Sequence, residues 1–258
     1  MRGTHHERGR AEGFGALAVT YDQLRPSYPI ALIHWLSQQG TGTAIDVGCG
    51  TGRVASLLAD FGWSVIGVEP DARMAAIARE HGIQVVVASF EQCELPEGSY
   101  DLVCAGTAWH WIDPAIGYDI AARLLRHGGR LALFRNSYIY DPDIAKGIVT
   151  SLQRHAPNLL HDCIPLGTAS KPLVESHAQH MSARSDLFTE LDRRTFTHER
   201  LVTVEDWIKE LQTHSPIATL DPSTRRRLLD DLAQHAAASS GDRLHIRHET
   251  PCVSVNRR

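Results

Sequence analysis

The sequence predicts a doubly wound α/β fold, in which helices cover both faces of a mainly parallel, seven-stranded sheet. Two observations carry this prediction. Short, continuously apolar runs alternate with amphipathic segments between residues 30 and 134, and glycines end most of the amphipathic segments. Continuous apolar runs are typical of strands buried on both faces, and strands that alternate with helices favour a parallel sheet.

The first half of the chain supplies the elements of this sheet in a regular order. An apolar pattern over residues 30–36 predicts a leading helix. The expected strands are residues 44–47, 64–68, 84–88, 100–105 and 130–134. The expected helices between them are residues 54–61, 71–81 and 116–125, and glycines such as Gly62 and Gly82 mark their ends.

The regular alternation stops after residue 134. Residues 138–188 and 200–242 have helical patterns and are expected to form a mainly helical cap, inserted into the C-terminal half of the sheet. Residues 189–199 and 243–258 are expected to hold the last strands. Residues 1–18 resemble a flexible leader, and residues 19–137 form the expected ligand-binding core. We therefore expect one domain.

The composition argues against several functions. The net charge of −4 does not favour binding to a nucleic-acid backbone. No apolar run approaches the ~20 residues that a membrane-spanning helix needs. The five cysteines are scattered and include no CxxC pair, as expected for reduced thiols in the cytoplasm. We expect a cytoplasmic protein that has neither a nucleic-acid nor a membrane partner.

A glycine-rich segment, AIDVGCGTGR, covers the first strand and the turn after it (residues 44–53), with glycines at every second position. A dinucleotide-binding fingerprint needs G-x-G-x-x-G, but residue 53 is Arg, and the chain contains no P-loop motif. The observed spacing suits a nucleoside and an amino-acid tail that lie against the backbone. Asp46 is placed either to accept a hydrogen bond from an ammonium group or to hold the loop.

An acidic residue follows the next strand. Glu69 comes directly after SVIGV, 19 residues beyond Gly50, where a carboxylate can accept hydrogen bonds from both hydroxyls of a ribose. The loop and the acid at this separation predict a ligand that contains a nucleoside.

Residues 19–134 resemble the class I S-adenosylmethionine (SAM)-dependent methyltransferases, in particular the small-molecule, type 11 branch related to ubiquinone and trans-aconitate methyltransferases. IDVGCGTG is similar to the first motif of that family, GVEPDARM to the second, and ASFEQCELPEGSYDLV to the third and fourth. LLRHGGRLAL resembles the stretch that enters the fifth strand, and AVTYDQLRPSYP a segment that closes over the cofactor. The resemblance implies a Rossmann-like fold, SAM as cofactor and S-adenosylhomocysteine as product.

The resemblance also implies a set of cofactor-binding residues. They are Tyr21, Arg25, Asp46, Gly48, Cys49, Gly50, Gly52, Glu69, Pro70, Met74, Ser89, Phe90, Glu91, Thr107 and Trp109. Phe90 is expected to stack on the adenine, and Ser89 or Glu91 to meet its amino group, although many relatives have Asp in place of Ser89. Arg25 and Tyr21 are expected at the cofactor carboxylate, because a guanidinium can bind a carboxylate through two hydrogen bonds. The alternative for both is that they pack a helix onto the sheet.

The segment TAWHWIDP follows the fourth strand, at the edge where open α/β sheets bind their ligands. Methyl transfer depends on alignment of the acceptor atom, and a general base assists when the acceptor is a hydroxyl or a protonated amine. His110 is the candidate base, with a structural role as its alternative. Trp111, Tyr138 and Tyr140 are the candidate substrate-binding residues, and ordinary packing is the alternative for the tyrosines.

No metal site is expected, because the cap histidines have no carboxylate or cysteine at a ligand spacing. These histidines are His155, His161, His177 and His180. The leading hypothesis is methyl transfer to an oxygen or nitrogen, less readily to a carbon, of a small organic acceptor. Three alternatives stay open: a protein or RNA target, a protein that binds SAM without using its methyl group, and a nicotinamide-dependent dehydrogenase, against which the incomplete glycine fingerprint counts.

Overall fold

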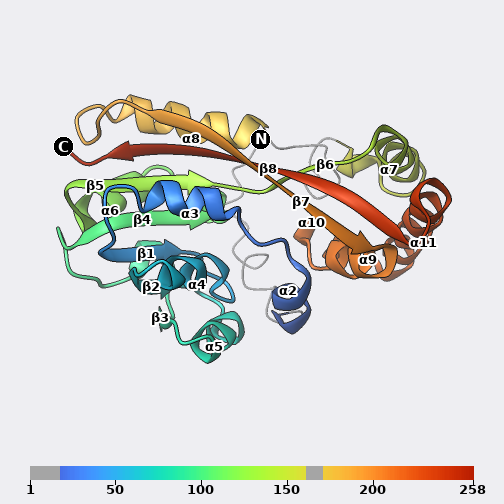
Figure 1. Cartoon of the computed structure of the whole chain (residues 1–258), viewed down its shortest axis with the longest axis horizontal. Helices are drawn as coiled ribbons and strands as arrows, with labels where there is room; N and C mark the ends of the chain where they lie inside the picture. The colour runs from blue at the N-terminus through green and yellow to red at the C-terminus, as the bar shows by residue number, and fades with distance from the viewer. Residues whose placement is uncertain (1–17, 161–170) are drawn as a thin grey trace.

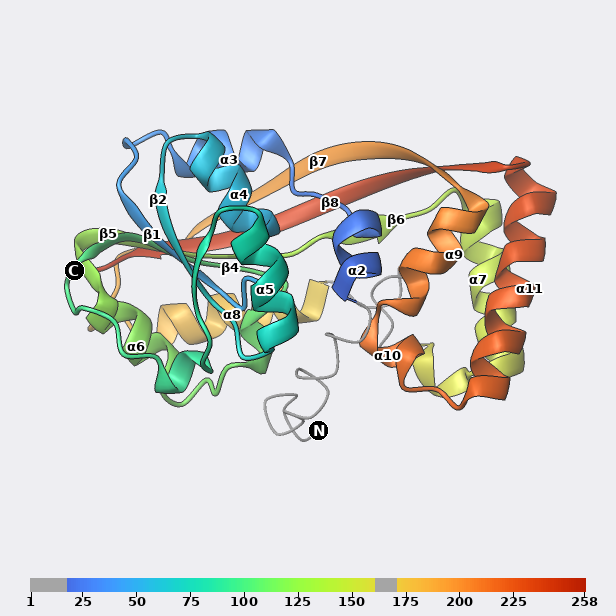
Figure 2. The same ribbon diagram turned by 90° about the horizontal axis from the view of Figure 1, so that it is seen from below.

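The computed structural model describes residues 18–160 and 171–258, with side chains for all of these except residues 171–173. The expected leader therefore lies outside the described residues, apart from Ala18. The chain forms a sheet-containing lobe and a helical lobe, and two long strands run from one to the other (Figures 1 and 2).

The sheet confirms the predicted fold class. Its eight strands include seven in the order β3-β2-β1-β4-β5-β8-β6, with β7 paired to β8. The strands are β1 (Thr43–Val47), β2 (Ser64–Val68), β3 (Gln84–Val86), β4 (Tyr100–Gly106), β5 (Leu125–Phe134), β6 (Ser137–Ile139), β7 (Asp192–Thr203) and β8 (Arg243–Asn256). The first five are parallel, and β8 is antiparallel to its partners. The strand that was not predicted is β6, which has three residues.

Helices cover both faces of the sheet. One face packs against α3 (Ile30–Leu36), α4 (Arg53–Asp60) and α5 (Ala72–Glu80). The other face packs against α6 (Gly117–Leu124) and α8 (Lys171–Ala183). Neighbouring strand residues serve opposite faces: Ala44 joins the α3–α4 core, and Ile45 the α6–α8 core. This alternation between two buried faces is why the central strands are apolar throughout.

The structure corrects the expected extent of the cap. Helix α8, expected in the cap, packs on the sheet, where Ala178 and Met181 are buried with Leu131 and Val253. Residues 200–203, also expected in the cap, belong to β7, which pairs with β8 over its whole length. The strand predicted within residues 189–199 is therefore confirmed, and it continues four residues further than expected.

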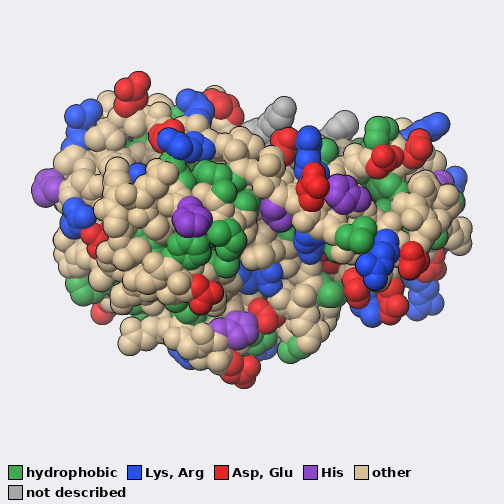
Figure 3. Space-filling model, viewed as in Figure 1, with side chains coloured by type: hydrophobic (Ala, Val, Ile, Leu, Met, Phe, Trp, Pro, Cys, Tyr) green, Lys and Arg blue, Asp and Glu red, His purple; other side chains and the backbone are tan. Residues whose placement is uncertain are grey.

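The helical lobe contains α7 (Pro142–His155), α9 (Val204–Gln212), α10 (Ser215–Ala218) and α11 (Pro222–Ser240). Asp141, Thr203 and Asp221 begin three of these helices, because each side chain accepts a hydrogen bond from a backbone N–H of the first turn. Figure 3 shows acidic and basic side chains interspersed over this lobe. Among the described helices, not even the 19-residue α11 has the length and apolarity that a membrane crossing requires.

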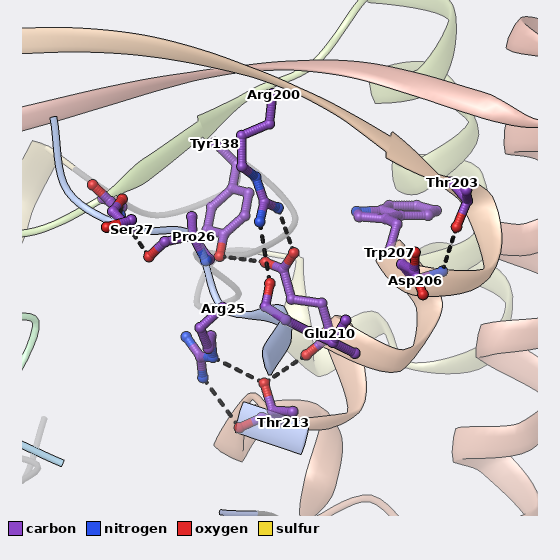
Figure 4. A network of polar contacts seen from close by, with 12 residues as sticks. Arg25, Pro26, Ser27, Tyr138, Arg200, Thr203, Asp206, Trp207, Glu210 and Thr213 are labelled. Atoms are coloured by element: carbon purple, nitrogen blue, oxygen red, sulfur yellow. Dashed lines mark hydrogen bonds and ion pairs between the residues drawn. The ribbon is translucent and has the colours of Figure 1, made fainter. Parts of the chain in front are cut away.

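A short helix, α2 (Ala18–Leu24), and a polar cluster join the lobes (Figures 2 and 4). Glu210 on α9 is 1% exposed; it accepts a hydrogen bond from Tyr138 Oη at 2.8 Å and pairs with Arg200 Nη2 at 2.5 Å. Arg200 also donates to the carbonyl oxygen of Leu24, at the end of α2. Although burial opposes ionisation, the hydrogen bond with His214 and the charge of Arg200 lower the pKa of Glu210 to about 2. Glu210 therefore carries its charge inside the lobe.

The turn between β1 and α4 has an unusual backbone. Gly48, Gly50 and Gly52 have φ values of +64°, +57° and +85°, a region that only glycine enters without strain. A Cβ on Gly48 would lie 2.5 Å from Cβ of Ala108, which follows β4. The glycine loop therefore packs directly on the segment after β4, with the methyl group of Ala108 between the two backbones.

We expect Gly48→Ala to destabilise the protein more than Gly98→Ala. Gly98 has nearly the same backbone, with φ of +62°, but no heavy atom lies within 4 Å of its would-be Cβ. The control should lose about 1 kcal/mol through backbone strain alone, and Gly48→Ala a further 1–3 kcal/mol, roughly, through overpacking. Urea unfolding measures both values. Equal losses would mean that Ala108 moves aside freely.

The buried ion pair should contribute far more to stability than an exposed pair on the same helix. Arg200→Met leaves the Glu210 carboxylate buried without its cation, and we expect the free energy of unfolding to fall by about 3 kcal/mol. Lys209→Met removes an exposed pair with Glu205, which water and salt screen, and should change the stability much less. Comparable losses in urea unfolding would contradict this account of the cluster.

Candidate functional site

The candidate site lies along the carboxyl ends of the parallel strands. The strand order reverses between β1 and β4, which is where open α/β sheets form a ligand-binding crevice. The glycine loop follows β1, and Glu69 follows β2. Thr107 and Arg135 directly follow β4 and β5. The topology therefore brings four sequence-distant segments to one edge of the sheet.

Glu69 is held at the glycine loop by two backbone hydrogen bonds. Its two carboxylate oxygens accept separately, one from the N–H of Gly50 and one from the N–H of Asp71, both at 2.9 Å. Burial raises the pKa of Glu69, and these two hydrogen bonds oppose the rise. Each oxygen keeps a further acceptor position, so the carboxylate is suited to bind a pair of hydroxyl groups beside the loop.

The other predicted residues around the loop support its shape. Asp46 accepts a hydrogen bond from the N–H of Ala55 at 3.1 Å, so it holds the start of α4, one of the two roles considered for it. Burial raises the pKa of Asp46 to about 8. Met74 lies under Gly50, while Cys49 is buried against Gly67. Gly52 packs closely on Ala78 of α5, and Pro70 is exposed beyond Glu69.

Phe90 does not lie where an adenine-stacking residue is expected. It begins the short helix η3 (Phe90–Gln92), is 2% exposed and packs against Trp109, with 5.5 Å between ring centroids. Its ring is therefore part of the core. Glu91 accepts a hydrogen bond from the N–H of Asp113 at 3.1 Å, and Ser89 Oγ lies 3.3 Å from Gln92 Oε1. Their contact with an adenine stays a prediction.

Arg25 is engaged in joining the lobes. Its Nε and Nη2 atoms donate to Oγ1 and the carbonyl oxygen of Thr213, at 2.9 and 3.1 Å, as Figure 4 shows. Its guanidinium lies 4.7 Å from the centre of the Tyr21 ring. In this structure Arg25 thus connects the end of α2 to the residue after α9, and its contact with a cofactor carboxylate stays a prediction.

His110 lines a pocket at the ends of β4 and β5. It belongs to the short helix η4 (Trp109–Trp111) and shares the pocket with Thr107, Arg135 and His177. Burial, followed by the positive charge of nearby Arg135, lowers the pKa of His110 to about 3. The imidazole is therefore neutral near pH 7, and in the empty pocket it is a weak proton acceptor. The tryptophans beside it differ: Trp109 is buried, and Trp111 is partly exposed, with its ring 4.8 Å from that of His110.

Thr107 turns the chain from β4 into this helix. Its φ of +59° lies in the left-handed region. Among the described residues, no other residue apart from glycines has a positive φ. Its N–H donates to the carbonyl oxygen of Phe134 at 2.8 Å, and its Oγ1 is 2.9 Å from the hydroxyl of Tyr28. These contacts hold a backbone conformation that by itself costs about 1–3 kcal/mol.

Tyr138 and Tyr140 do not line the His110 pocket. Strand β6 carries them into the helical lobe, where Tyr138 Oη donates to Glu210 and Tyr140 Oη accepts a hydrogen bond from Trp207 Nε1 at 3.1 Å. The prediction that they contact the substrate assumed that the chain stays beside the pocket after β5. The continuation of the strand along β8 instead carries it away.

Two further residues of the pocket are Arg135, which the sequence analysis did not single out, and His177, which it considered only among the cap histidines. Arg135 is 4% exposed, and burial lowers its pKa to about 10, so it remains charged at neutral pH. His177 comes from α8; burial, together with the charge of Arg135, lowers its pKa to about 4. Arg135 carries a signal that could have been used, because a charged residue directly after an apolar strand is the pattern that identified Glu69. Within residues 18–160 and 171–258, no group of three His, Cys, Asp or Glu side chains is placed to bind a metal ion. His161 lies outside these residues.

Comparisons with known proteins agree with this arrangement. Residues 45–133 match the family model described as a methyltransferase domain. The chain is 28% identical over 256 residues to an uncharacterized methyltransferase of Mycobacterium bovis, which covers 97% of this chain and 98% of that protein. It is 26% identical to the ubiquinone biosynthesis O-methyltransferase of Acinetobacter baumannii, over 72% of this chain and 92% of that protein.

The fold has a counterpart among solved structures. A protein of Anaeromyxobacter dehalogenans, assigned as a type II methyltransferase, superposes with a TM-score of 0.69 at 24% identity, covering 90% of this chain and 97% of that chain. The strand order, the glycine loop with Glu69 and these likenesses agree with one another: residues 45–133 match a methyltransferase domain, and the chain has the fold of, and resembles, the class I SAM-dependent methyltransferases.

Proposed function

We propose that the protein transfers the methyl group of SAM to an oxygen or nitrogen atom of a small organic acceptor bound in the His110 pocket. The observation that carries this proposal is the contact between pocket and loop. Ala108 lines the pocket and also lies against Gly48, so acceptor and cofactor would occupy adjoining spaces. The likeness to a ubiquinone O-methyltransferase supports a small acceptor.

We further propose that the enzyme acts in the cytoplasm and without nucleic-acid or membrane partners, in line with its net charge of −4.

The residues present fit the cofactor. The glycine loop offers backbone that a Cβ would obstruct, and Glu69 offers acceptor positions for the ribose hydroxyls. SAM, when bound there, supplies a methyl group on a sulfonium that is a good leaving group. The protein then has to align the acceptor and exclude water. His110 lies in the pocket and is the candidate to accept the proton of an acceptor hydroxyl or ammonium at a ring nitrogen, which requires the bound acceptor to raise its pKa from about 3.

A transfer assay with SAM labelled on its methyl group tests the proposal. The protein is incubated with a metabolite extract, and the small-molecule, protein and RNA fractions are counted separately. We expect label in the small-molecule fraction. Glu69→Gln should weaken SAM binding, measured by calorimetry, about 10- to 100-fold through the loss of a charge-assisted hydrogen bond.

The exposed Glu97→Gln variant is the control for that substitution, because its carboxylate pairs only with Arg123 at the surface. Label in the protein or RNA fraction would overturn the small-molecule acceptor. Unchanged SAM affinity in Glu69→Gln would overturn the ribose assignment.

His110→Ala should separate proton transfer from cofactor binding. If His110 accepts the proton of the acceptor, turnover falls about 100-fold, while the dissociation constant of SAM stays within about twofold. His155→Ala is the control, since that histidine is paired with Asp231 in the helical lobe. An unchanged turnover number in His110→Ala would make the residue structural.

A further inference from the structure

We propose that the acceptor carries an oxyanion group, a carboxylate or a phosphate, and that Arg135 binds it at the carboxyl end of β5. This inference rests on the proposed function and names the chemical class of its substrate. The observation behind it is a buried guanidinium that the described residues leave without a partner.

The unpartnered atoms of Arg135 are specific. Its Nε and Nη2 are buried, and neither has a hydrogen-bond partner in the described part of the chain. A guanidinium is a rigid fork of donors that matches the two oxygens of a carboxylate or phosphate. Leaving such a group unpaired away from water is unfavourable, so its persistence in a pocket points to a ligand that completes it.

Arg135 gives the pocket a positive charge that its neighbours do not neutralise. Its titratable neighbours in the pocket are His110 and His177, which burial keeps neutral, and the other walls include Leu133 and Val174. Among the described residues that line the pocket, none is an Asp or a Glu. A single positive charge between apolar walls attracts an anion more strongly than the same charge in water.

The strand register explains why Arg135 points into the pocket. Strands β5 and β6 form one interrupted strand, since Phe134 pairs with Cys252 and Ser137 with Glu249 in the same register. Phe134 packs toward α3 and α4, so Arg135, the next residue, faces the α6–α8 side, from which His177 comes.

A carboxylate also occurs in the methionine part of SAM, so the two sources of an oxyanion have to be distinguished. No residue of the glycine loop and no part of Glu69 lines the Arg135 pocket, which favours the acceptor as the source. An oxyanion held by Arg135 would leave the rest of the acceptor near His110 and Ala108, beside the loop.

The test combines three variants with two kinds of measurement. Binding of succinate and of inorganic phosphate to the protein saturated with S-adenosylhomocysteine is measured by calorimetry. Labelled-methyl transfer is measured with a metabolite extract separated on an anion exchanger into retained and unretained fractions. The variants are Arg135→Gln, Arg135→Lys and the control Arg130→Gln, whose guanidinium lies on the same strand but over the Trp35 ring.

We expect one of the two anions to bind the wild type at least 10-fold more tightly than it binds Arg135→Gln, and acceptor activity to appear in the retained fraction. Arg135→Gln should lower transfer at least 30-fold and leave SAM affinity within twofold. Arg135→Lys should keep part of the activity, and Arg130→Gln all of it. Removal of the unpaired charge by Arg135→Gln should also raise the midpoint of urea unfolding, which a structural arginine would lower.

Three outcomes would overturn the inference: acceptor activity in the unretained fraction, failure of both anions to bind the wild type, or a loss of SAM affinity in Arg135→Gln that equals the loss of transfer. The last would assign the guanidinium to the cofactor carboxylate. Absence of label in every fraction would count against the proposed function, and the anion-binding measurement would still decide the role of Arg135.

Discussion

The pairing of β8 with three other strands is the constraint on which both lobes depend. One edge of β8 pairs with β5 near its C-terminal end and with β6 further back, while the other edge pairs with β7 from Asp192 to Thr203. A continuous backbone ladder therefore extends from the sheet into the helical lobe, as Figure 2 shows. Because the ladder is hydrogen-bonded along its length, the helical lobe is a continuation of the sheet and not a domain on a linker.

The elements that the sequence predicts well are those whose residues are determined by their immediate neighbours. The helix over residues 30–36 and the strand over residues 64–68 agree at both ends, and the other central elements agree within a few residues, apart from β5, which starts at Leu125. Continuous apolar runs, glycine stops and a capping Asp71 are local signals. Glu69 and the glycine loop were found in the same way, because a short strand fixes both the position and the direction of the residue after it.

The residues whose protein contacts the sequence does not predict depend on partners far along the chain. Arg25 meets Thr213, Tyr138 meets Glu210, and Phe90 is covered by Trp109, which the topology alone brings together. An arginine, a tyrosine or a phenylalanine can either contact a ligand or be buried in the protein. Which of the two occurs depends on residues that lie far away in the sequence. The same holds for α8, whose amphipathic pattern shows that it packs on something but not on what. Arg135 was missed for a different reason, since its local signal was present and was not used.

Two unfavourable features of the fold lie at one edge of the sheet. Thr107, with its left-handed backbone, directly follows β4, and the unpaired Arg135 directly follows β5; the N–H of Thr107 bonds to the carbonyl oxygen of Phe134, the residue before Arg135. The strands behind them are paired on both sides by β1, β4, β5 and β8, so neither residue can relax by shifting its strand. A rigid sheet can hold a strained turn and an unpaired charge in place. In a flexible loop, the turn would relax and the charged group would move into solvent. A site held in that state is already arranged for an anionic ligand, and binding then requires little further reorganisation.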